Sequence, residues 1–159
     1  MWPTNWPAIP RTIAEATDDA LTAVRATDRD ALDEAIAELA KLPNPQVTAV
    51  HVQIVRELLE TVHPDGLTSD DVHAVLDRTA RSAVAWLPDL DVAVIADVLT
   101  GALGVSDPDE DAPKHGRTAY LRAAVLVVAD LAATAGLPTG DYIRRAIGEI
   151  ARAETVEMP

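Results

Sequence analysis

Signals that end helices recur along this chain at regular intervals, and they constrain its fold more than any other feature. Pro43, Pro88 and Gly136-Leu137-Pro138 close segments of helical length, and His63-Pro64-Asp65-Gly66 forms a further stop. Proline lacks the backbone N–H that a helix interior needs, and glycine favours the turn that follows a helix. Between these stops, apolar side chains recur three and four residues apart, which is typical of helices with one buried face. The sequence therefore predicts an all-α fold, a compact bundle of about six to seven helices joined by short turns.

The expected helices lie at about 11–25, 28–42, 45–63, 69–87, 91–104, 117–135 and 140–153. Thr27 and Thr139 are the expected N-caps of the second and the last helix. The fifth and sixth helices are apolar nearly all round and should lie at the centre. Residues 1–10 are expected to form an extended N-terminal arm, residues 11–159 a single helical domain, and residues 106–116 an acidic loop broken by proline.

An α/β fold is the alternative, with strands near 47–55, 92–96 and 124–129. Val50-His51-Val52-Gln53-Ile54 alternates between apolar and polar residues, and the other two stretches are rich in β-branched residues. Each stretch continues without a break into helix-forming sequence, which favours the all-α fold.

The charge of the chain excludes several classes of function. Asp and Glu number 26 against 13 Lys and Arg, which gives a net charge of −13. Such a chain is not expected to bind nucleic acid, whose phosphates need cations, or an anionic membrane surface. Cysteine is absent, no secretory leader is visible, and the longest apolar run, 123–129, is too short to span a membrane. We therefore expect a cytoplasmic protein, and the scarcity of lysine among its basic residues indicates a GC-rich bacterial genome.

The densest set of ligand-type side chains surrounds the turn between the third and fourth helices. Glu60 and His63, and likewise Asp70 and His73, place a carboxylate and an imidazole on one helical face. Pairs of Glu-x-x-His units hold the metals of di-iron bundles, so these four residues are weak candidates for metal ligands. The alternative is that they complement the helix dipoles at the two helix ends. We predict no metal and no cofactor.

Three further polar residues lie in otherwise apolar helices. His51 shares a face with Val47 and Ile54 and should point inward as a neutral imidazole bonded to a carbonyl or hydroxyl, with a general base as the alternative. Asp97 and Asp130 are candidates for an acid/base pair if both are buried. A structural role is favoured, and Arg122, Arg144 and Arg145 are the expected partners of Asp130.

Trp2 and Trp6 concentrate aromatic area in one short arm of a chain that is only 3% aromatic. Tryptophan is enriched at interface hot spots, so these two residues are the predicted partner-binding residues. The alternatives are that the arm covers a groove of its own bundle or crosses to a second copy.

The absence of a complete catalytic motif favours a non-enzymatic protein–protein interaction or regulatory module. Its acidic surface favours a basic protein partner. Self-association into a homodimer is also expected, because two nearly all-apolar helices are hard to bury in a small bundle. The alternatives are a metal-binding bundle or metal-dependent hydrolase that uses the four ligand-type residues, and a small-molecule sensor with an apolar pocket between the fifth and sixth helices.

Overall fold

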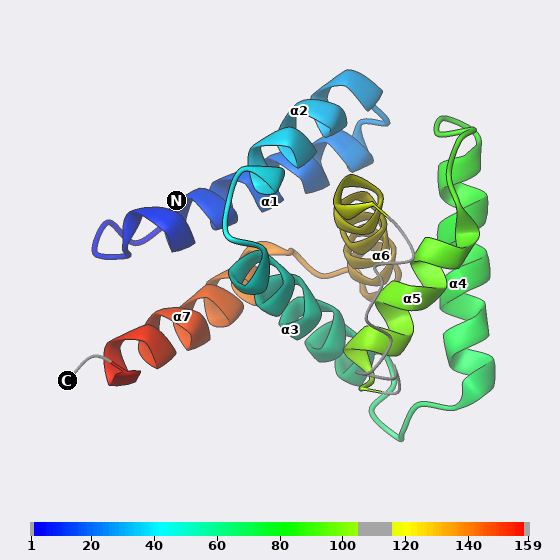
Figure 1. The fold of residues 1–159 in the computed structure, drawn as a ribbon. Helices are drawn as coiled ribbons and strands as arrows, with labels where there is room; N and C mark the ends of the chain where they lie inside the picture. The colour runs from blue at the N-terminus through cyan, green and yellow to red at the C-terminus, as the bar shows by residue number, and fades with distance from the viewer. Residues whose placement is uncertain (1, 105–115, 158–159) are drawn as a thin grey trace.

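The computed structural model describes residues 2–104 and 116–157, and within them the chain forms helices and no strand. The seven helices of this described part are α1 (Ala8–Arg25), α2 (Arg29–Ala40), α3 (Asn44–Val62), α4 (Ser69–Val84), α5 (Val92–Ala102), α6 (Arg117–Ala135) and α7 (Gly140–Glu157). The all-α prediction is therefore confirmed (Figure 1). The alternative strands near 47–55, 92–96 and 124–129 lie inside α3, α5 and α6, so the α/β alternative is wrong.

The N-terminal arm is shorter than predicted. Helix α1 begins at Ala8, so the extended backbone does not reach residue 10. Pro10 lies in the first turn of α1, where the first N–H groups of a helix need no intrahelical acceptor, so proline does not delay the start of the helix. The predicted acidic loop over 106–116 lies outside the described residues except for Gly116.

The N-cap of α2 lies one residue later in the chain than predicted. The N-cap of α2 is Asp28, whose carboxylate accepts a hydrogen bond from the Ala31 amide. Thr27 instead adopts a positive φ of 50° and ends α1. Thr68 and Asp71 form a capping box at α4, and Gly136 ends α6 in the left-handed conformation, as the glycine stop predicts.

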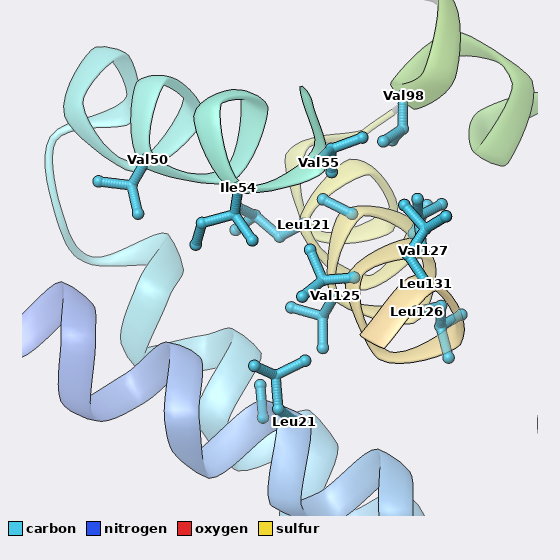
Figure 2. Packing of buried hydrophobic residues seen from close by; sticks show 14 of the residues in the cluster. Leu21, Val50, Ile54, Val55, Val98, Leu121, Val125, Leu126, Val127 and Leu131 are labelled. Atoms are coloured by element: carbon cyan, nitrogen blue, oxygen red, sulfur yellow. The ribbon is translucent and has the colours of Figure 1, made fainter. Parts of the chain in front are cut away.

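Helix α6 is the centre of the fold, as its apolar sequence predicts. It packs against all five preceding helices. In Figure 2 it points Leu121 toward α3, Val125 toward Leu21 of α1, and Val127 toward Val98 of α5. Nine of its residues are buried, and they include the continuous run 123–128, so the middle of the helix carries apolar side chains on every side.

Helix α6 is the one helix of the described residues that is long and apolar enough to cross a membrane, with a mean hydropathy of 1.4. Its position among five other helices is typical of the core helix of a water-soluble protein. Helix α5 is also covered within the chain, on the side of Val94, Ile95, Val98 and Leu99. One chain thus covers most of α6 and one side of α5, whereas Val92 of α5 is 45% exposed. Self-association into a homodimer stays a prediction.

Arginine side chains join helices at their ends and along their sides. The Arg117 guanidinium, at the start of α6, donates to the carbonyls of Leu39, Ala40 and Leu42 and so caps the end of α2. Arg56 of α3 donates to the Ala102 carbonyl, the last residue of α5. These bonds satisfy carbonyls that lack intrahelical partners and fix the ends of α2 and α5 against the core.

Candidate functional site

Helices α1 and α2 form an antiparallel hairpin at one side of the molecule (Figure 1). A groove lies between them. Its hollow has a volume of about 570 Å³. We call it the α1–α2 groove, and its lining consists of Asp19, Thr22, Ala23, Ala26, Asp28, Ala31, Glu34, Ala35, Ala37 and Glu38. The five alanines explain the hollow, because a methyl group leaves space that a longer side chain would fill.

The rim of the α1–α2 groove is negatively charged. Four of its lining residues are carboxylates, and the lining contains no lysine, arginine or histidine. Asp28 is engaged as the N-cap of α2, and Glu38 pairs with Lys41 at 3.0 Å in an exposed contact. Among the described residues, no hydrogen bond or ion pair holds the exposed side chains of Asp19 and Glu34. An alanine floor between free carboxylates can accept an apolar stripe flanked by cations.

Sequence reasoning did not find this groove, although its signal is present. Acidic residues and alanines alternate with helical spacing through 18–38. The pattern resembles that of an ordinary solvated helix face. Only the approach of the two helices shows that the alanines border one hollow and that the carboxylates lie along its edges.

His51 lies in the core, as predicted, and is held by a hydroxyl. It is 3% exposed, and its Nε2 lies 3.0 Å from the Thr17 hydroxyl of α1. Burial lowers the pKa of His51 to about 4, so the ring is neutral at pH 7. No carboxylate bonds to this ring within the described residues, and its buried Nδ1 has no partner there, so the contact with Thr17 acts as a polar link between α1 and α3.

The carboxylates Asp97 and Asp130 do not form a pair. Asp130 accepts two-pronged hydrogen bonds from the Arg78 guanidinium of α4, at 2.9–3.1 Å. The predicted partners were wrong: Arg122 pairs with Asp33, Arg144 with Asp141, and Arg145 with Glu57. Asp97 lies near Tyr120, whose pKa is raised by burial first and by the Asp97 charge second. Neither carboxylate is thus placed as the acid/base partner of the other.

The four weak metal candidates are not gathered into one site. No group of three or more His, Asp or Glu side chains within the described residues is arranged to hold a metal ion. Glu60, Asp70 and His73 are exposed, and His63 Nδ1 lies 3.0 Å from the Leu59 carbonyl. The carboxylate of Asp71 lies 3.9 Å from His63 Nε2. It accepts a hydrogen bond from the Thr68 amide, and this bond lowers the pKa of Asp71. The turn is organised by helix caps.

The two tryptophans of the arm are folded back on their own bundle. Trp2 and Trp6 stack with ring centroids 6.1 Å apart, and both pack half-buried against the core. The guanidinium of Arg144 on α7 lies 5.9 Å from the Trp2 ring, which fits a cation–π contact. Partner binding through these residues stays a prediction, and it would require part of this stacked surface to be shared or released.

A second, smaller hollow of about 220 Å³ lies between α1, α4 and α6. It is not the pocket between α5 and α6 that was expected, because no residue of α5 lines it. We call it the α1–α4–α6 pocket, and it is lined by Val24, Arg25, Thr27, Thr79, Ser82, Ala83, Trp86, Leu126, Ala129, Asp130 and Ala133.

Comparison with known proteins adds no relative to this description. No family model, curated protein or solved structure matches the chain.

Proposed function

We propose that this protein is a non-enzymatic binding module, and that the α1–α2 groove binds a basic, amphipathic segment of another protein. The observation that supports the proposal most is the combination of an alanine-lined hollow with four carboxylates and no cation in its lining. Lysine or arginine side chains of the partner would lie against Asp19 and Glu34, and a stripe of small apolar side chains would lie on the alanines. A cytoplasmic location belongs to the same proposal.

The net charge of the chain favours a different protein over a second copy as the occupant. Two copies that each carry −13 repel one another. The chain also has few basic residues to offer, since only Arg144-Arg145 places two of them side by side. A cationic partner is instead attracted over the distance of a Debye length, about 8 Å at physiological salt, which raises its association rate.

The size of the groove favours a transient complex. A stable interface buries about 800 Å² on each partner, which is more than one groove between two short helices offers. We therefore expect weak binding that depends on charge, with rapid release of the partner. Such binding suits an adaptor or a regulatory module that exchanges partners.

The experiment uses a fluorescently labelled helical peptide of lysine, alanine and leucine as the probe, with a peptide that carries glutamate in place of lysine as its control. Fluorescence anisotropy measures binding to the full chain at low and moderate salt. The groove variant is Asp19→Asn/Glu34→Gln. Its matched control is Asp65→Asn/Glu60→Gln, which removes the same two charges from the exposed turn region between α3 and α4.

We expect the lysine peptide alone to bind, with an affinity that falls as salt is added. The groove variant should bind about fivefold more weakly, since each exposed ion pair contributes a fraction of a kcal/mol, and the control variant should change little. Equal loss in both double variants would contradict a located site. Loss on Trp2→Ala/Trp6→Ala instead would move the binding site to the arm.

A further inference from the structure

The α1–α4–α6 pocket is a second hollow whose chemistry differs from that of the groove. Its floor is the side of α6 that carries Leu126, Ala129 and Ala133, and its walls include Val24 of α1 and the Trp86 ring that follows α4. The small side chains of Ala83, Ala129 and Ala133 leave the space open, and no larger side chain of α1 or α4 fills it. The walls are therefore mainly apolar and partly aromatic.

One buried polar group in this lining has no partner. Thr79 is 1% exposed, and among the described residues its hydroxyl makes no hydrogen bond. A buried hydroxyl without a partner destabilises a protein, so such groups are rare and call for an explanation. Asp130, which also lines the pocket, is already neutralised by Arg78. The buried hydrogen-bonding capacity that is left free in the lining thus belongs to Thr79.

We propose that the α1–α4–α6 pocket binds a small monocyclic aromatic alcohol, with its ring between Trp86 and Leu126 and its hydroxyl bonded to Thr79. The size fits, because an apolar cavity of about 150 Å³ accepts benzene, and this hollow of about 220 Å³ has room for a ring with a short substituent. A single hydroxyl on the ligand satisfies the one buried, unpartnered hydroxyl of the described residues. Trp86 supplies an aromatic face for the ring.

The test compares phenol with toluene, which has the same size and lacks the hydroxyl. Both are titrated into the isotopically labelled full chain, and chemical shifts are followed at the amides of Thr79 and Ala129 and at the Trp86 indole. Three variants accompany the wild type: Thr79→Val, which keeps the shape and removes the hydroxyl, Ala129→Leu, which fills the pocket, and Ala37→Leu, which adds the same bulk in the α1–α2 groove.

We expect saturable shifts with phenol at these three positions. Thr79→Val should weaken phenol binding about fivefold and leave toluene binding unchanged, because it removes one hydrogen bond and no volume. Ala129→Leu should abolish binding of both, and Ala37→Leu should change neither. Absence of saturable shifts in the wild type would overturn the proposal. Equal effects of Thr79→Val on phenol and toluene would also overturn it, and this comparison does not depend on the folding of Ala129→Leu.

Discussion

At the residue scale, Thr27 occupies a position where glycine is usual. The Asp28 amide donates to the Ala23 carbonyl and the Thr27 amide to the Val24 carbonyl, which is the hydrogen-bond pattern of a Schellman motif. Helix α6 ends in the same motif, with the Leu137 amide on Ala132 and the Gly136 amide on Ala133. The two helix ends are thus equivalent in backbone, with a β-branched residue at one and glycine at the other.

Thr27→Gly should therefore stabilise the protein by about 1 kcal/mol, because the left-handed conformation strains a side chain that branches at Cβ. Gly136→Ala should destabilise it by a similar amount. No atom lies within 4 Å of a Cβ built at Gly136, so backbone conformation alone sets the cost. Urea denaturation measures both changes. A loss of stability in Thr27→Gly would mean that the threonine side chain contributes more than its strain costs.

His51 makes the stability of the fold depend on pH. Its pKa is about 4 in the folded protein and 6.5 in the unfolded chain, so between these values the unfolded chain binds more protons. The contribution is fully present above pH 6.5 and is lost as the pH falls toward 4, by about 3 kcal/mol over the whole range.

His51→Gln should flatten the fall in unfolding free energy between pH 7 and pH 5, because glutamine does not titrate. His73→Gln, at an exposed histidine, is the matched control and should keep the wild-type slope. Urea unfolding at a series of pH values measures the slopes. Identical slopes in wild type and His51→Gln would show that His51 is not the group responsible.

At the scale of elements, the ion pair between Arg78 and Asp130 fastens α4 to the central helix. The Asp130 side chain is 10% exposed and that of Arg78 is 39% exposed. Arg78→Met should therefore destabilise the protein by about 2 kcal/mol, and Asp130→Ala should destabilise it by less. Arg78→Met leaves a carboxylate in a poorly solvated place, whereas a freed Arg78 can reach water. Thermal unfolding of both single variants and the double variant checks this, and strictly additive losses would show no coupling between the two residues.

The same elements show what the sequence can and cannot predict. Helix α6 and the capping box of α4 follow from local signals, namely an apolar run between glycines and the Thr68-x-x-Asp71 pattern. The partner of Asp130 lies 52 residues away, and the sequence alone favoured Arg122, Arg144 and Arg145 instead. Only the packing of α4 on α6 selects Arg78. The N-cap of α2 was misassigned because Thr27 has the side chain of an N-cap while its backbone ends the preceding helix.

At the scale of the whole molecule, the large apolar residues lie in the core and the acidic residues lie on the surface. Five helices pack against α6, and together with α7 they bury nearly all of the large apolar side chains in one core. What remains outside is an acidic surface with a sequence pI of about 4.5. The two hollows lie where alanines take the place of larger side chains. The spacing of apolar residues in the sequence does not predict them, because they form only when the helices pack.

The α1–α2 groove as the docking site of a basic segment is the central claim, and mapping the lysine peptide on the isotopically labelled chain by NMR tests it most directly. We expect shifts that concentrate at the amides of Asp19, Ala23, Glu34 and Glu38 and that shrink when salt is added. Shifts that concentrate at Trp2 and Trp6, that spread evenly over the acidic surface, or that do not saturate would contradict the claim.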